Sequence, residues 1–184
     1  MKTLYKSLIR SHLEYTCPLW IGLSKGDMQR IEAIQRYFTN RITCPVEVEN
    51  YWDRLEYLKL MYLQRRRERY AILHMWKLLH KKISNDLDIR FFENRRYGIT
   101  AELPPIQRSS NSKAKSLYEL SFAVRGPQLW NVVPKDIKMI NNLINFKAKL
   151  DNFLCSIPDR PSVVGYITQH DNSLLEWNSI RLPI

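Results

Sequence analysis

Residues 61–83 read MYLQRRRERYAILHMWKLLHKKI and contain neither glycine nor proline. Their apolar residues share one stripe at helical spacing: Met61, Ile72, Trp76, Leu79 and Ile83. This spacing predicts the longest helix of the chain. Arg65 and Glu68 continue the stripe three residues apart, so we expect a modest ion pair between them on the helix surface. The other side carries Leu63, Tyr70 and Leu78 among its charges, which is typical of a helix lying between two layers or contacting a partner.

Shorter helices are predicted before this segment. Residues 3–16 have apolar positions at helical spacing and no glycine or proline before Pro18. A second helix should begin near Ser24 or Asp27, either of which can cap it, and run to about Ile42. A short helix is expected around residues 51–58.

The pattern changes after residue 94. Residues 94–115 contain Gly98, two adjacent prolines and a polar Ser/Asn run, which indicates a loop or the tip of a hairpin. The flanking stretches 97–103 and 118–124 alternate apolar and other residues, so we expect them to pair as a two-stranded ribbon. Pro127 can open a short helix through Val133.

The last predicted helix is capped by Asn141 or Asn142 and extends to about Leu154, with Phe146, Leu150 and Phe153 facing inward. These patterns predict a mainly α fold, a helical bundle with a small two-stranded β-ribbon inserted before the last helices. We expect a helical region over 1–93, the ribbon and C-terminal helices over 94–155, and a poorly ordered tail over 156–184 apart from contacts by Trp177.

Composition limits the classes of protein that fit. The formal charge is +11, and 45% of the residues are hydrophobic, which excludes intrinsic disorder and favours a packed domain with an anionic partner. Cys17, Cys44 and Cys155 are odd in number and far apart, which argues against a secreted disulfide framework and a zinc site. No apolar run is long enough for a membrane span or a signal peptide, so we expect an intracellular protein, nuclear or cytoplasmic.

Patterns that carry catalysis are absent from the sequence. A polymerase usually supplies adjacent aspartates as metal ligands, and this chain has no Asp-Asp pair. Asp86 and Asp88 are more typical of turn or capping residues than of a metal site. The four histidines show no metal-ligand spacing, and no glycine-rich phosphate loop occurs. The residues alone therefore indicate a basic, mainly helical, non-catalytic binding domain without metal or cofactor.

Several sequence blocks together resemble a known family. Residues 4–15, LYKSLIRSHLEY, followed by Trp20, resemble the segment just downstream of the palm in reverse transcriptases of jockey-like non-LTR (LINE-type) retrotransposons. Residues 31–36 resemble the family's basic thumb helix, and 54–67 its next helices. Residues 129–134, LWNVVP, resemble its Trp-Asn-x-x-Pro turn, and Phe146-Lys147-x-x-Leu150 closes the series. Ser11 stands where the family tends to have proline.

The resemblance implies a thumb-like and post-thumb region of an RNA-directed DNA polymerase. In that family the catalytic Asp-Asp turn and the palm lie upstream, and Met1 stands where the palm should already have ended. No catalytic residue can therefore be transferred to this chain. The implied role is to grip the backbone of a template–primer, either RNA or an RNA–DNA hybrid.

Six residues are candidates for nucleic-acid binding. At about 100° per residue, four of them form a basic band opposite the 61–83 core stripe. The candidates are Arg66, Arg67, Lys77 and Lys81 in this band, together with Arg30 and Arg36 in and beside the thumb-like block. A solvated helix face is the competing interpretation of these charges. The competing function is a protein-interaction or structural remnant that once packed on a missing palm or that self-associates. The large aromatic residues Trp130, Phe146 and Phe153 are expected to serve packing first.

Overall fold

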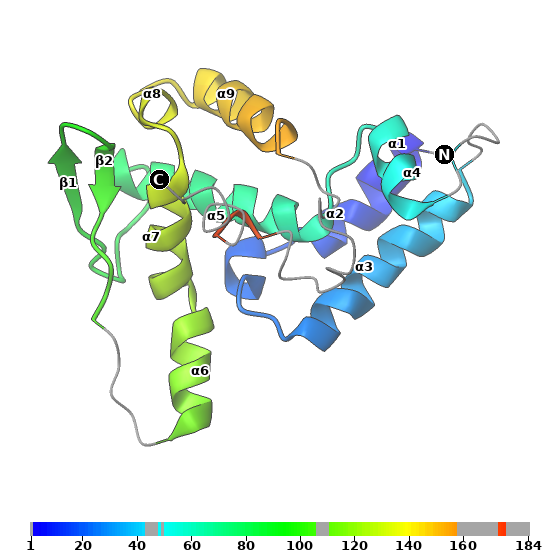
Figure 1. The fold of residues 1–184 in the computed structure, drawn as a ribbon, viewed down its shortest axis with the longest axis horizontal. Coiled ribbons are helices and arrows are strands. Elements are labelled where there is room, and N and C mark those ends of the chain that lie inside the picture. The colour runs from blue at the N-terminus through cyan, green and yellow to red at the C-terminus, as the bar shows by residue number, and fades with distance from the viewer. Residues whose placement is uncertain (1, 43–47, 49, 106–110, 158–172, 176–184) are drawn as a thin grey trace, which may run out of the picture.

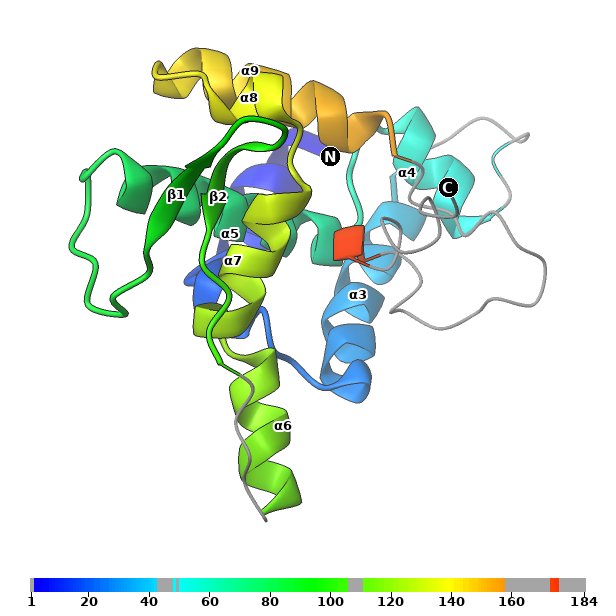
Figure 2. The same ribbon diagram turned by 60° about the vertical axis from the view of Figure 1, so that its left-hand side comes forward.

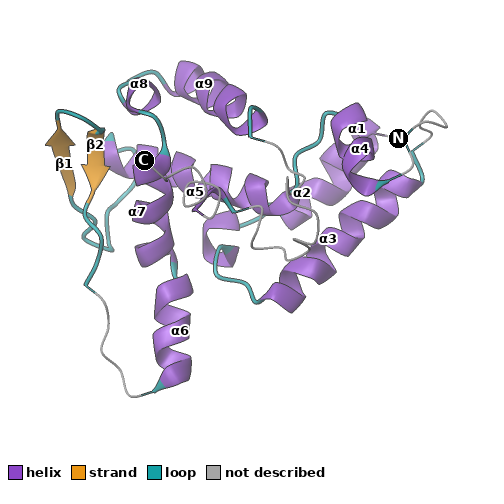
Figure 3. Ribbon diagram, viewed as in Figure 1, coloured by secondary structure: helices purple, strands orange, loops and turns teal. Residues whose placement is uncertain are grey.

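The computed structural model describes residues 2–42, 48, 50–105, 111–157 and 173–175. These residues form a mainly helical fold with one two-stranded antiparallel sheet, which confirms the predicted fold class (Figure 3). The longer helices are α3 (Lys25–Asn40), α4 (Tyr51–Tyr57), α5 (Leu63–Leu79), α6 (Ser112–Leu120), α7 (Phe122–Val132) and α9 (Leu143–Cys155). Within these ranges every helix is too short or too polar to cross a bilayer.

The N-terminal segment is helical from residue 2 to residue 13 but is not a uniform α-helix. It consists of α1 (Lys2–Leu4), a π-helical turn at Tyr5–Ile9 and α2 (Arg10–Leu13). Thr16 then adopts a left-handed backbone conformation, with φ of 51°, and ends the segment. The predicted helix over 3–16 is thus confirmed, with an interruption that its sequence did not reveal.

Side-chain caps fix the starts of the next two helices; the cap at Ser24 was predicted, and the cap at Asn50 was not. Ser24 Oγ accepts the Asp27 N–H at 3.2 Å at the start of α3. Asn50 Oδ1 accepts the Asp53 N–H at 3.0 Å at the start of α4. Each cap satisfies one of the amide groups that a helix leaves unpaired at its first turn.

Helix α5 runs through the middle of the molecule, with α7 on one side and α9 on another (Figure 1). Trp76 of α5 packs on Phe146 of α9, and Phe146 in turn packs on Trp130 of α7, so that one core joins residues from the regions 1–93 and 94–155. The helix therefore lies between two layers. This is one of the two arrangements that the apolar residues on both of its sides predicted, the other being contact with a partner. It ends at Leu79, four residues earlier than Ile83, because Lys81 has a positive φ of 52°.

The ribbon forms with one of the two predicted strands, 97–103, and with a different partner strand. Strand β1 (Phe91–Asn94) pairs with β2 (Gly98–Ala101) in the register Phe91 with Ala101 and Asn94 with Gly98. Residues 118–124, predicted as the second strand, belong to α6 and the start of α7. Asn111 Oδ1 caps α6 by accepting the Lys113 N–H at 3.0 Å. Alternate residues such as Tyr118 and Phe122 are also four apart, so a helix satisfies the same pattern.

Of the two remaining predicted helix starts, one differs from the structure and one agrees with it. Helix α7 begins at Phe122 after Ser121, five residues before Pro127, which lies inside the helix and does not open it. Helix α9 begins after Asn142, whose Oδ1 accepts the Ile144 N–H at 2.9 Å, as one of the two predicted caps should. Between them lies the short α8 (Lys135–Lys138).

The hairpin lies beside α7 (Figure 2), and two adjacent residues of that helix bind it. Trp130 is fully buried, and its Nε1–H donates to the Ile99 carbonyl at 2.9 Å. Asn131 accepts the Ala101 N–H at 2.8 Å and donates to the Ala101 carbonyl at 2.9 Å. The predicted packing role is confirmed for Trp130 and Phe146, while Phe153 is only partly buried.

Most of the predicted tail, including Trp177, lies outside the described residues. Residues 173–175, however, pack on α5: Ser173 Oγ–H donates to Glu68 Oε1 at 2.8 Å, and the Leu174 N–H donates to Glu68 Oε2 at 3.1 Å. Arg65 Nε lies 3.8 Å from Glu68 Oε2, so the predicted ion pair exists. Its predicted place on the helix surface is wrong, because both side chains are buried under this segment and α5 is enclosed.

Candidate functional site

The structure does not gather the predicted basic residues on one exposed surface. Arg67 is only 3% exposed, and its Nη1 has no hydrogen-bond partner among the described residues. Arg66 and Lys77 are partly buried, while Lys81 is exposed beyond the end of α5. The expected band of four is therefore broken, because the layers that enclose α5 also cover the middle of its basic side.

The two candidates on α3 are exposed but lie apart from α5's charges. The Arg30 side chain is 85% exposed and forms a 3.5 Å ion pair with Asp27 one turn earlier. Arg36 is exposed, and its guanidinium lies 4.8 Å from the Tyr51 ring centroid. Such surface contacts contribute little to stability and leave both side chains accessible.

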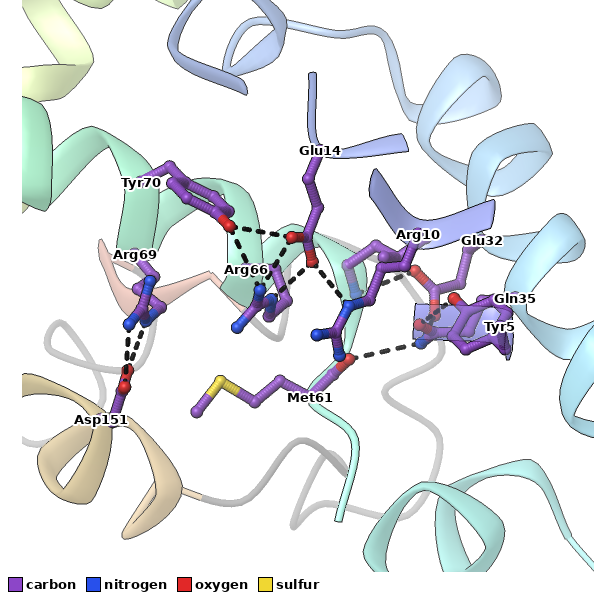
Figure 4. A network of polar contacts seen from close by, with 11 residues as sticks. Tyr5, Arg10, Glu14, Glu32, Gln35, Met61, Arg66, Arg69, Tyr70 and Asp151 are labelled. Atoms are coloured by element: carbon purple, nitrogen blue, oxygen red, sulfur yellow. Dashed lines mark hydrogen bonds and ion pairs between the residues drawn. The ribbon is translucent and has the colours of Figure 1, made fainter. Parts of the chain in front are cut away.

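One predicted residue, Arg66, belongs to a more enclosed group of charges. Its Nε and Nη2 donate to the two oxygens of Glu14 at 2.7 and 2.8 Å, and Tyr70 OH donates to the same carboxylate at 2.9 Å (Figure 4). Arg10 Nε lies 3.1 Å from Glu14 Oε1. Burial alone would raise the pKa of Glu14, but the bonds and charge of Arg66, together with Arg10 and Tyr70, hold it below its usual value.

Positively charged side chains outnumber negatively charged ones around Glu14. Lys2, Lys6 and Arg10 follow one another at intervals of four residues along the N-terminal helical segment. Burial lowers the pKa of Lys6, and the nearby charges that lower it further are Lys2, Arg10 and Arg66. Burial and Arg66 likewise lower the pKa of Arg10. We call Lys2, Lys6, Arg10 and Arg66 the cation cluster. Among the described residues Glu14 offsets it, and Asp151 also acts on Arg66, so positive charge remains in excess and an added anion would relieve its repulsion.

The π-helical turn lies within this row of cations. Tyr5, at the start of the turn, is buried, and its OH donates to Gln35 Oε1 at 2.6 Å. Gln35 Nε2 donates to Tyr51 OH at 2.9 Å, and Tyr51 OH donates to Glu32. Single π turns inside helices are frequent at functional sites. Here Tyr5 fixes the buried face of the turn, and its neighbour Lys6 is partly buried.

Glu32 extends this buried network to the central helix. Its second oxygen, Oε2, accepts the Leu63 N–H at 3.2 Å, at the first residue of α5. A carboxylate at a helix N-terminus is stabilised by the unpaired amides and by the helix dipole. The network therefore sets α3, α5 and the N-terminal segment in a fixed relation, and with them the cation cluster.

A cleft of about 780 Å³ opens beside the cation cluster. We call it the cationic cleft; one wall is formed by Lys6, Arg10 and Arg66, and the rest by Trp52, Asp53, Leu55, Glu56, Lys59, Leu60, Met61, Asp151, Leu154, Cys155, Ser156 and Ile157. Asp151 is bound by Arg69, whose Nη2 donates to Oδ2 at 2.8 Å. The lining thus contains three kinds of side chain, which we name as follows. The cationic wall is Lys6, Arg10 and Arg66, the acidic edge is Asp53 and Glu56 of α4, and the apolar floor is Trp52, Leu55, Leu60, Met61, Leu154 and Ile157; Lys59 adds a further cation just after α4.

Within the described part of the chain, no three His, Cys, Asp or Glu side chains gather to hold a metal ion. Asp86 accepts Ser84 Oγ–H at 3.0 Å and Asp88 pairs with Arg90 at 3.4 Å, both in an exposed turn. The turn interpretation of these two aspartates is therefore confirmed.

Sequence reasoning did not identify Lys6 and Arg10 as site residues, although both lie in the family-like block 4–15. Their spacing with Lys2 is visible in the sequence and could have been read as a row on one helix face. Their association with Arg66 could not be predicted in this way, because Arg66 lies 56 positions after Arg10 and only the fold brings the two together. Comparisons of the chain with protein-family models, with curated proteins and with solved structures found no match.

Proposed function

We propose that the chain is a non-catalytic nucleic-acid-binding module that holds the sugar–phosphate backbone through the cation cluster. The observation that carries this proposal is the excess of partly buried cations, Lys6, Arg10 and Arg66, around the carboxylate of Glu14. Arginine can bind a phosphate with two parallel N–H groups, and lysine can approach one as a point charge. A phosphate placed at the cluster would compensate charges that now repel one another.

The resemblance of residues 3–155 to the region downstream of the palm in jockey-like non-LTR retrotransposon reverse transcriptases supports the same proposal. It suggests an RNA–DNA hybrid or RNA as the ligand and an intracellular location, in the nucleus or the cytoplasm. The chain would then contribute to holding a template–primer while polymerase chemistry takes place on a palm domain. It would have no such chemistry of its own.

Binding at two or more salt concentrations tests the proposal. The assay is fluorescence anisotropy with a labelled RNA–DNA hybrid, and the test variant is Lys6→Gln with Arg10→Gln. Its slope of log K against log salt should be shallower by roughly 0.7–0.9 for each phosphate that it no longer neutralises. A matched control, Lys147→Gln with Lys149→Gln, removes the same charge from the exposed side of α9. Equal slopes for the two variants, with circular dichroism unchanged, would refute a role for the cluster.

A protein-interaction role is the second candidate, and one observation favours it. Leu4, Leu8, Tyr15 and Leu19 are between 56% and 80% exposed along the N-terminal segment. Contiguous exposed apolar surface is typical of interaction sites. Salt-independent association of the protein, with no binding to the hybrid, would favour this role over backbone binding.

A further inference from the structure

We propose that the cationic cleft receives one unpaired nucleotide of the bound strand, with its phosphate at Lys6 and Arg10 and its base on the apolar floor beside Trp52. This inference rests on the proposed nucleic-acid binding and specifies that the ligand carries an unpaired nucleotide. It follows from the size of the cleft, from the cations and carboxylates in its lining and from the aromatic side chain of its apolar floor.

The size of the cleft fits a small ligand. Its volume of about 780 Å³ lies within the range of roughly 300–1,000 Å³ that small-molecule sites occupy. A base stacked and paired within a duplex cannot enter such a cleft, because its partner and its neighbours enclose it. An unpaired nucleotide at an end or in a loop can be turned out of the strand at low cost.

The lining of the cleft contains charges of both signs, which a nucleotide can use. The cationic wall can bind a phosphate, while Asp53 and Glu56 form the acidic edge on α4. Asp53 contacts Asn50 at the helix cap, whereas Glu56 is exposed and no ion pair joins it to another described residue. A carboxylate accepts hydrogen bonds from the exocyclic amino group of cytosine or adenine, which uracil lacks. Glu56 is therefore suited to prefer an amino-bearing base.

The apolar floor of the cleft is partly aromatic. Trp52 is half-buried, and its ring lies 5.2 Å from that of Tyr62 and 5.6 Å from that of Tyr51, measured between centroids. Leu60 and Met61 line the cleft beside it. Aromatic side chains next to a basic groove are the usual means of holding unpaired bases, because every base has a face that can stack.

Ligands that differ only in their bases test this inference. We compare a hybrid with a two-nucleotide cytidine overhang, the same hybrid with an abasic overhang of equal phosphate count, and a blunt hybrid. The cytidine overhang should bind about fivefold tighter than the abasic one, the lower end of what base stacking contributes. Equal affinities for these two would overturn the inference while leaving backbone binding intact. Failure of all three to bind would instead refute the proposed function.

Glu56→Gln separates base recognition from simple electrostatics. If the carboxylate only repels the strand, its removal should tighten binding to every ligand alike. If it accepts from the base, the preference for a cytidine over a uridine overhang should fall in the variant. A matched control is Glu119→Gln on α6, which removes an exposed carboxylate outside the cleft. An unchanged cytidine preference in Glu56→Gln would refute the assignment of this residue.

Cys155 supplies a readout that does not depend on affinity. Its thiol is exposed and lines the cleft, whereas Cys17 is buried and burial raises its thiol pKa to about 11. Alkylation followed by peptide mass spectrometry should show Cys155 protected several-fold by a saturating cytidine overhang and not by the blunt hybrid. Equal protection by both would mean that no base enters the cleft.

Discussion

Replacing Glu14 with glutamine should lower the stability of the fold and strengthen its hold on phosphate. The carboxylate now accepts two hydrogen bonds from Arg66 and one from Tyr70, and its side chain is 10% exposed. In Glu14→Gln, the amide nitrogen would face a guanidinium donor, and Arg10 and Arg66 would repel each other without compensation. Bonds to a buried charged group are worth about 1.5–3 kcal/mol each, and truncating one partner of a pair leaves the other unpaired.

We expect a decrease in unfolding free energy of about 2–3 kcal/mol, below the sum of the separate bonds because the glutamine oxygen can still accept one of them. For a chain of this length that corresponds to a decrease in Tm of roughly 4–12 °C. Calorimetry or thermal circular dichroism measures it. The control is Glu119→Gln, whose partner Lys115 lies 3.9 Å away with both side chains about half exposed, and whose Tm should stay nearly unchanged. A Glu14→Gln variant as stable as this control would refute the network.

The pH dependence gives a second check on the same residue. The folded-state pKa of Glu14 lies below its ordinary value of 4.5, so its stabilisation is present above that pH and is lost as pH falls through the folded pKa. The difference in Tm between wild type and Glu14→Gln should therefore narrow in acid. At neutral pH the variant has one more net positive charge at the cluster and should bind the hybrid more tightly at low salt, with a steeper salt slope.

Further predictions concern packing, charge, association and catalysis. Gly22→Ala should lower the free energy of unfolding by about 1–3 kcal/mol, because the new Cβ would lie 2.3 Å from the Leu120 carbonyl oxygen. Gly26→Ala within α3 should instead raise it by roughly 0.5–1 kcal/mol. Urea titration of both variants measures the two changes. Burial lowers the pKa of Lys138 to about 8 from its ordinary value of 10.5, so between these pH values the unfolded state binds more protons than the folded state. The free energy of unfolding should therefore rise with pH over this range in the wild type but not in Lys138→Met. Sedimentation at tens of micromolar should show self-association that Leu4→Gln with Leu8→Gln reduces; a monomeric wild type would contradict this. Primer extension with Mg²⁺ or Mn²⁺ should yield no product, and metal-dependent extension that disappears on changing a carboxylate would contradict the non-catalytic assignment.

Local signals in the sequence predicted most of the helices, and a local cap decided the segment whose pattern was ambiguous. Ser24, Asn50 and Asn142 are caps that act within a few residues, so their helices could be located from the sequence alone. Residues 118–124 carried a pattern that both a strand and a helix satisfy, and the cap at Asn111 decided for the helix.

The candidate site was less predictable than the fold. Charge alone suggested that Arg66 and Arg67 share an exposed face. In the structure these adjacent residues of α5 have different neighbours. Arg66 forms an ion pair with Glu14, while Arg67 is buried beside Glu32 and Cys17. These neighbours come from distant parts of the chain, so no periodicity within α5 could reveal them. Lys6 and Arg10 gained their significance only from that arrangement.

The contact between α7 and the hairpin also governs how the small sheet ends. A two-stranded sheet has outer edges whose unpaired amide and carbonyl groups can recruit a strand from another molecule and begin aggregation. On the outer edge of β2, the Ile99 carbonyl is bound by Trp130, and both backbone groups of Ala101 are bound by the Asn131 amide. The Asn131 side chain thus takes the place of a third strand. The Trp-Asn pair closes this edge, so the sheet stays two strands wide and intermolecular pairing at β2 is blocked without any charge on the strand.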